Sequence, residues 1–273
     1  RRKRGIVGYC RFFFIYVWFL LIITSTSCSR ESADILYKTG QDLWSKGETE
    51  KSLNKFLNII EKYPASDLHD DALFKAGELY YLSNSDFSNA IKSFRQLLLI
   101  KNTRVKLKFQ AQSYIAEIYE NSLNDYDQAI IEYQRLINNF ENWISPGEGQ
   151  FKIAKCYFKK GDYKQAIVEY ETLVERFPVS PLVEEAIYQI VTSDFILGEC
   201  SKAVKNYDRF EEKFPDSRFM PEIKFEIGSC YEEEGNLLES LTIFRELKDN
   251  YSNKKLLEMK ISSIEKRLSA RRR

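Results

Sequence analysis

One short pattern recurs six times along this chain, and its period determines what the chain can fold into. In each copy a small residue is followed directly by an aliphatic residue and, four positions on, by an aromatic residue, as in Ala90 to Phe94. An apolar residue three positions after each aromatic completes the i, i+4, i+7 spacing of a buried helical face. The copies begin at Ser52, Ala90, Ala129, Ala166, Ala203 and Ser240, 37 to 39 residues apart. Such a period predicts an array of repeated units, each burying its apolar face against its neighbours.

A second helical stripe lies upstream of each copy. It pairs a small residue with a larger apolar one three positions later, as in Gly77 and Tyr80, although the fifth copy has Val191 and Asp194 there. Proline follows the second helix in three copies and stops it, because proline lacks an N–H donor. The turns between the helices are Lys46-Gly47, Asn84-Ser85-Asp86, Asn124-Asp125, Lys160-Gly161, Leu197-Gly198 and Glu234-Gly235. Each unit therefore reads as helix, turn, helix and break, which predicts an all-α fold.

These features resemble the tetratricopeptide repeat (TPR), which has Gly and Tyr in its first helix, Ala-x-x-x-Phe in its second and Pro at its end. The resemblance covers residues 33–253 and implies a right-handed solenoid of helical hairpins. A capping helix, 254–273, would follow the array. The repeats would lie near 33–66, 70–103, 109–142, 147–180, 184–217 and 221–253.

The first 27 residues have the composition of a secretory signal. Five basic residues flank or precede an apolar run, Phe12 to Ile23, which is followed by small polar residues and Cys28. The run would rise only ~18 Å as a helix, too little for a hydrocarbon core of ~30 Å. Cys28 resembles the acylated cysteine of bacterial lipoproteins, although Ser25 stands where those usually have Leu. We expect cleavage after residue 27 and a lipidated segment, 28–32; the alternatives are a signal-anchor helix or an ordinary signal peptide.

The linkers between repeats narrow the resemblance. Aromatic-Pro-x-Ser stands at Tyr63–Ser66, Phe177–Ser180 and Phe214–Ser217, ahead of an acidic and apolar helix start. With a lipidated N-terminus, this resembles the exported TPR lipoproteins of the BamD type, although those usually have five repeats. The resemblance implies a scaffold at the periplasmic face of the outer membrane, with a role in β-barrel protein assembly. Ser29, not Asp, follows Cys28, and in the sorting pattern of such lipoproteins the lack of Asp there also implies the outer membrane. A cell-wall coordination factor of the CpoB (YbgF) type and an inner-membrane-anchored, chaperone-like TPR protein remain alternatives.

In TPR arrays the first helix of each repeat lines a concave face through its positions 2, 5, 9, 12 and 13. Position 2 here is mostly acidic and position 5 mostly aromatic, so the resemblance implies a groove for peptides. An acidic first turn also suits the helix dipole, and the aromatics would equally suit packing between hairpins. The Lys and Asn of a carboxylate clamp are largely missing, apart from Lys155 and Lys159. The groove candidates are Tyr37, Trp44, Phe74, Tyr81, Phe158 and Phe195.

The overall charge of +1 hides an uneven distribution. Residues 28–253 hold 28 Lys and Arg against 38 Asp and Glu, a net charge of −10, whereas residues 254–273 carry +6. An acidic array argues against nucleic acid as a partner. The apolar stripe Leu257, Ile261, Ile264 and Leu268 predicts a capping helix, with contact to lipid headgroups or an acidic partner as the alternative.

Enzymatic chemistry finds little support. The chain has a single histidine, His69, and no phosphate-binding or nucleophile-elbow motif, so we expect no catalysis, metal, cofactor or small-molecule substrate. Of the five cysteines, Cys156, Cys200 and Cys230 would remain beside the acylated Cys28. Their wide spacing predicts helical thiols rather than disulfides.

Overall fold

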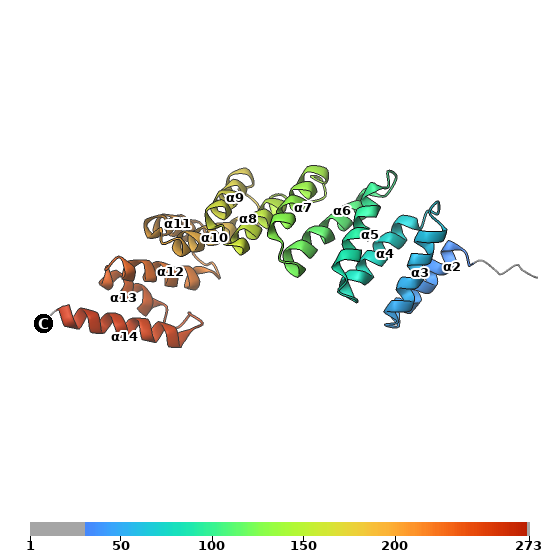
Figure 1. Cartoon of the computed structure of the whole chain (residues 1–273). Coiled ribbons are helices and arrows are strands. Elements are labelled where there is room, and N and C mark those ends of the chain that lie inside the picture. The colour runs from blue at the N-terminus through green and yellow to red at the C-terminus, as the bar shows by residue number, and fades with distance from the viewer. Residues whose placement is uncertain (1–30, 272–273) are drawn as a thin grey trace, which may run out of the picture. The chain divides into compact units, whose positions relative to one another are not determined.

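The computed structural model describes residues 31–271 and forms two compact units, one ending at Leu79 and the other starting at Tyr80. The described residues fold into thirteen α-helices and one π-helical turn, so the predicted all-α fold is confirmed (Figure 1). The first unit contains α2 (Ala33–Ser45), α3 (Thr49–Lys62) and most of α4 (His69–Leu82). The second contains α5 (Phe87–Leu99), α6 (Val105–Glu117), η1 (Ile118–Ser122), α7 (Tyr126–Asn139), α8 (Glu148–Lys160), α9 (Tyr163–Arg176), α10 (Val183–Ile196), α11 (Cys200–Lys213), α12 (Met220–Glu233), α13 (Leu237–Glu246) and α14 (Lys254–Arg271). Within the second unit each of these helices packs on the next one in the chain.

The small residues of the repeat are explained by the first hairpin. Gly40 on α2 faces Phe56 on α3, and a Cβ added to Gly40 would lie 2.9 Å from Cζ of Phe56. The Ser52 hydroxyl donates a hydrogen bond of 2.7 Å to the carbonyl oxygen of Gly40. Two helices meet this closely only where both present small side chains, here Gly40 and Ser52. The ring of Phe56 fills the space beside this contact.

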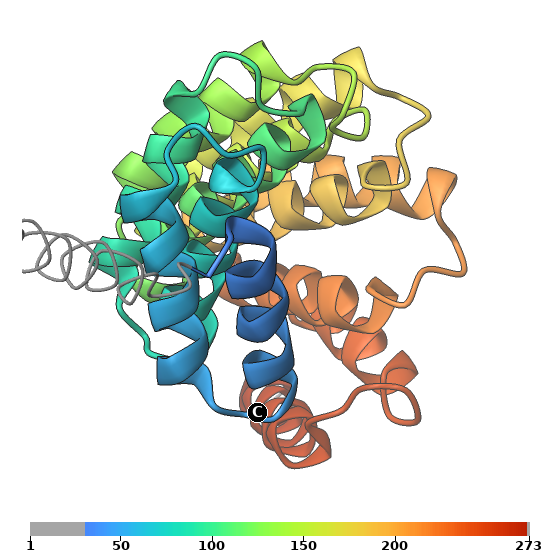
Figure 2. The same ribbon diagram turned by 90° about the vertical axis from the view of Figure 1, so that its right-hand side faces the viewer.

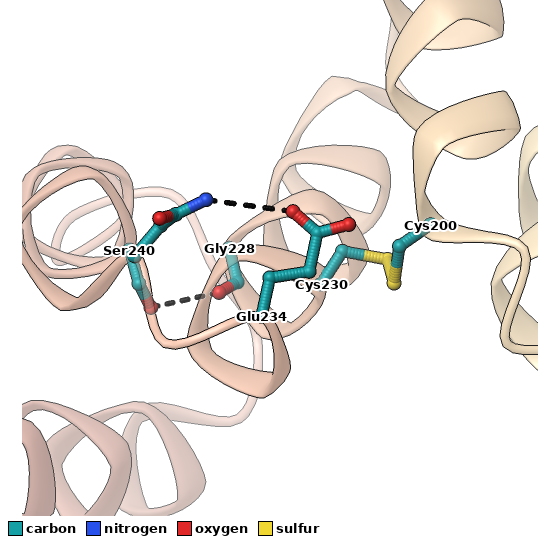
Figure 3. Close-up of a disulfide and its surroundings, with 6 residues drawn as sticks. Cys200, Gly228, Cys230, Glu234 and Ser240 are labelled. Atoms are coloured by element: carbon teal, nitrogen blue, oxygen red, sulfur yellow. Dashed lines mark hydrogen bonds between the residues drawn. A yellow bond between two sulfur atoms is a disulfide. The ribbon is translucent and has the colours of Figure 1, made fainter.

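The same joint closes the last hairpin of the array. Ser240 on α13 donates to the carbonyl oxygen of Gly228 on α12 at 2.7 Å (Figure 3). Phe244 fills the space beside Gly228. In the copies between, alanine takes the place of serine, and Ala90, Ala129, Ala166 and Ala203 are fully buried. The sequence pattern therefore marks the contact between the paired helices.

The fifth copy has a polar contact between its two paired helices. Asp194 on α10 stands where most other copies have Tyr, and it is 2% exposed. Nδ2 of Asn206 on α11 donates to it at 2.8 Å. Burial raises the pKa of Asp194, while this hydrogen bond acts in the opposite direction. Asn206 thus satisfies the one acid that departs from the repeat pattern.

The linker serines hold successive repeats in register. Ser180 donates to the carbonyl oxygen of Pro146, one repeat earlier, at 3.0 Å and accepts from the amide of Leu182. Ser217 donates to Glu184 at 2.6 Å and accepts from the amide of Phe219. Each serine thus caps its own turn and reaches back to the start of the preceding repeat's first helix.

The turns of repeats two and three carry one residue more than the others. In the first repeat the amide of Glu48 bonds to the carbonyl oxygen of Leu43, five residues back, whereas that of Asp125 reaches Tyr119, six back. Ser85 and Asn124 adopt positive φ where the shorter turns use glycine. In repeat three the extra residue is taken up by the π-helical turn η1. Turn residues were predicted at these places, but the π-helical turn was not.

The C-terminal helix α14 closes the second unit and lies beside α13 in both views (Figure 1 and Figure 2). Its stripe is buried at Leu257, Ile261 and Ile264, which agrees with the sequence. Glu232 on α12 accepts from Lys260 at 2.7 Å and Arg267 at 2.9 Å, so two basic residues of α14 tie it to the array. Among the described residues, no helix is both long and apolar enough to cross a membrane.

The prediction that the cysteines are unpaired is wrong for two of them. Cys200, the first residue of α11, forms a disulfide with Cys230 of α12, and their Cα atoms lie 5.3 Å apart (Figure 3). They are 30 residues apart in sequence, and only the packing of consecutive hairpins brings them together. Cys156 is a free, buried thiol, and burial raises its pKa to about 12.

Candidate protein-binding site

Three of the six groove candidates lie in the first unit. Trp44 is half-buried, and Nζ of Lys75 lies 5.0 Å from its ring centroid, a cation–π contact. Tyr37 meets the ring of Phe56 edge-on at 5.4 Å. Phe74 is only 6% exposed, so its ring offers a partner almost no surface.

The other three candidates lie in separate hairpins of the second unit. Tyr81 contacts Phe87 and Tyr114, with ring centroids 6.1 and 5.9 Å away. Phe158 meets the ring of Tyr163 at 5.2 Å. Phe195 is partly buried against the core of repeats four to six. Phe158 and Phe195 pack against the same hydrophobic core, and the role of all three candidates in binding stays a prediction.

The structure instead gathers aromatic and acidic side chains at repeats five and six. Tyr188, at position 5 of α10, stacks on Phe219 with ring centroids 4.5 Å apart and planes 10° from parallel. Phe225, at position 5 of α12, stacks on Tyr251 at 4.5 Å and 4°. Four rings in two parallel pairs thus surround this face.

A poorly neutralised carboxyl group lies among these rings. Glu226 on α12 accepts from the Thr192 hydroxyl on α10, which lies 3.1 Å from both carboxylate oxygens. Burial raises the pKa of Glu226 to about 8 against the hydrogen bond from Thr192, and nearby Glu222 raises it further. Within residues 31–271, no ion pair joins Glu226 to a Lys or Arg.

The tyrosines at this face respond to the same negative charge. Burial and then Glu226 raise the pKa of Tyr188, followed by a weaker contribution from Glu185. The pKa of Tyr251 is raised by burial first and then by Glu222 and Glu226. We call Glu185, Tyr188, Thr192, Phe219, Glu222, Phe225, Glu226 and Tyr251 the aromatic–acidic site. Its chemistry suits a lysine or arginine side chain, which would pair with the carboxylates and stack on the rings.

Part of this site falls on the TPR positions that the sequence resemblance assigns to the groove. Glu185 and Glu222 are position-2 residues, and Thr192 occupies position 9, which the TPR resemblance assigns to the same face. Glu226 and Tyr251 carry no such signal. Tyr251 follows α13 and reaches the site only because the chain folds back toward α14.

Lys159, one of the two lysines noted in the predicted groove at repeat four, already has partners within the chain. Nζ of Lys159 donates to Glu120 at 2.7 Å and to Asn121 at 3.1 Å. Glu120 is 1% exposed and also accepts from the hydroxyl of Tyr133 at 2.6 Å. Lys159 therefore neutralises a buried acid, which explains this lysine without a bound carboxylate ligand.

Two solved structures with similar folds illustrate the architecture. A tetratricopeptide repeat protein from Parabacteroides merdae is 12% identical with a TM-score of 0.51, over 85% of this chain and 98% of that chain. The structure of Naa15/Naa10 bound to HypK-THB gives a TM-score of 0.63 at 16% identity, over 85% of this chain and 34% of that chain. At these identities the likeness shows the fold alone. A search of curated protein sequences found no match.

Two family profiles match parts of the amino-acid sequence. The tetratricopeptide repeat profile matches residues 71–99, 110–142 and 223–254. The profile described as YfiO, outer membrane lipoprotein, matches residues 145–237, which contain all of the aromatic–acidic site except Tyr251. These are families of protein-binding scaffolds rather than enzymes. The chain thus contains tetratricopeptide repeats, and its residues 145–237 are similar to the YfiO outer membrane lipoprotein family.

Proposed function

We propose that this chain is a lipid-anchored scaffold that binds proteins at the periplasmic face of the outer membrane during β-barrel protein assembly. The family relationship supports the location and the role. The observation that carries the proposal is the aromatic–acidic site, whose residues are half-buried and all but one of which lie inside the family match. Cys28 would carry the lipid; it lies outside the described residues.

The aromatic–acidic site would hold a basic side chain of the partner protein. Among the described residues Glu226 lacks a cationic partner, and its raised pKa reflects the free energy needed to bury a carboxylate without one. A partner's ammonium or guanidinium group would supply the missing charge and lower that pKa again. Binding would therefore release a proton, and affinity would rise with pH as the solution approaches a pH of about 8.

Site-specific crosslinking in isolated envelopes tests the proposed role. A photo-reactive amino acid replaces Tyr188, and a matched control replaces Val168, an exposed apolar residue of α9. We expect the Tyr188 position to capture the β-barrel component of the outer-membrane assembly machinery and the Val168 position not to do so. Capture of cell-wall enzymes alone would favour a CpoB-like role, and capture of inner-membrane translocation partners would favour the chaperone-like one.

Mass spectrometry of the mature N-terminus tests the anchor independently. We expect a diacylglyceryl group on Cys28 and a shift of the protein to the soluble fraction in the Cys28→Ala variant. An intact N-terminus without lipid would show that the scaffold is held at the membrane in another way.

A further inference from the structure

A groove lies between α5 and the π-helical turn η1, away from the aromatic–acidic site in the sequence. It encloses about 530 Å³. Its lining on α5 follows helical spacing: Ser88, Lys92, Arg95 with Gln96, and Leu99 share one face. Phe87 and Ile91 complete that side, and Tyr119 and Leu123 form the other. We call these nine residues the α5–η1 groove.

The π-helical turn shapes this groove. The amide of Leu123 bonds to the carbonyl oxygen of Ile118, five residues back, at 3.0 Å, which is the bond of a π-helix. Tyr119 lies within the turn and Leu123 directly follows it, so the extra residue of repeat three lies where the groove forms. The inserted residue thus supplies lining and not only a longer connection.

Positive charge is concentrated and fixed at this groove. The Arg95 guanidinium lies 3.3 Å from the hydroxyl of Tyr119 and 3.2 Å from Glu132. Glu132 is 1% exposed and also accepts from Arg135 at 2.7 Å and Gln112 at 2.8 Å. Lys92 adds another cation at the surface. Two cations, Lys92 and Arg95, therefore line the groove, in an array whose net charge is −10, and Glu132 shares its charge between Arg95 and Arg135.

Large apolar side chains stand beside these cations. Leu99 is 83% exposed and Leu123 is 44% exposed, whereas the opposite face of α5 is buried at Phe94 and Leu97. Among the described residues that line the groove there is no Asp or Glu. A partner that fits must therefore bring both apolar surface and negative charge.

We propose that the α5–η1 groove binds a short segment of another protein in which Asp or Glu stands beside Leu, Ile or Phe. The acidic side chain pairs with Lys92 and the held guanidinium of Arg95, and the apolar side chain packs on Leu99 and Leu123. This goes beyond the proposed scaffold role, because it assigns a second surface with the opposite charge preference. Such a surface lets one array hold two different segments at once.

The test uses a displayed library of short random-sequence peptides selected on the intact mature chain. We expect enriched peptides to combine acidic and apolar residues. The Lys92→Glu variant should weaken their affinity roughly three- to tenfold and Leu99→Asp about tenfold or more. Lys164→Glu and Val168→Asp on α9 change the same residue types outside the groove and should leave affinity unchanged. All four positions are exposed, and circular dichroism checks that each variant is folded.

Peptides that lack acidic residues, or whose binding ignores Lys92→Glu and Leu99→Asp, would overturn the proposal. Vesicles of phosphatidylglycerol and phosphatidylethanolamine provide a second probe. Vesicle binding that depends on Lys92 and Leu99, without selected peptides that do so, would assign the groove to anionic lipid and equally refute a peptide ligand. Neither result bears on crosslinking at Tyr188, so the scaffold proposal is tested separately.

Discussion

Substitution of Glu226 tests whether its carboxyl is buried without neutralisation. Its pKa is raised from 4.5 to about 8 in the folded chain, so folding favours the protonated form. That stabilisation is fully present at pH values below 4.5, declines as the pH rises, and is lost above about 8. At ~1.4 kcal/mol per pKa unit, the loss across this interval is on the order of 3–5 kcal/mol. Glu226→Gln keeps an oxygen that accepts from Thr192 and removes the charge, so its stability should not show this decline.

Urea unfolding followed by circular dichroism at a series of pH values measures the difference. The parent midpoint should fall steadily between pH about 5 and pH about 8, and the Glu226→Gln midpoint should fall less, so that the variant is the more stable protein at the upper end. Glu185→Gln is the matched control, because no pKa shift is assigned to Glu226 from that neighbour. Parallel pH dependence in the parent and in Glu226→Gln would refute the argument that an unpaired carboxylate is buried here.

Three further predictions concern the fold and two of the groove candidates. Cys200→Ser removes a disulfide that closes 30 residues, and urea unfolding should show a loss of roughly 3–4 kcal/mol; an unchanged midpoint would mean that the disulfide does not restrict the unfolded chain. Gly228→Ala places a Cβ 2.7 Å from Phe244 and should lower stability by about 1–3 kcal/mol, measured by thermal unfolding against the parent. The pair Trp44→Ala and Tyr81→Ala should weaken binding of an unfolded β-barrel client in a fluorescence titration while circular dichroism stays unchanged; equal affinity would place the client site elsewhere.

The sequence predicted the helical hairpins because their contacts are local and repeat. A small residue such as Ser52 lets α3 approach Gly40 closely. Because each hairpin has the same close contact, each copy has Ser or Ala at this position. The proline breaks and turn residues are similarly local. The apolar stripe of α14 could be found for the same reason, since helical spacing alone places Leu257 and Ile264 on one face.

The features that could not be predicted depend on how one hairpin meets the next. The disulfide joins the first residue of α11 to α12, and no spacing rule along the chain indicates that 30 residues return to within 5.3 Å. The extra residue of repeat three is visible in the sequence as a longer spacing between copies. The spacing does not tell whether a longer turn or a π-helical turn accommodates that residue. Tyr251 joins the aromatic–acidic site from outside the repeat pattern altogether.

The net charge of −10 in the array acquires a different meaning once its acids are located. Glu132 is buried among Arg95, Arg135 and Gln112, so it serves to position cations at the α5–η1 groove. Glu226 is half-buried, and among the described residues only the hydroxyl of Thr192 bonds to it, so its carboxyl group has no cation to neutralise it. The same residue type, glutamate, therefore belongs to a basic surface at repeats two and three and to an acidic surface at repeats five and six. It follows that the partner preference of each surface is determined by the side chains around an acid, and neither preference can be obtained by counting charges.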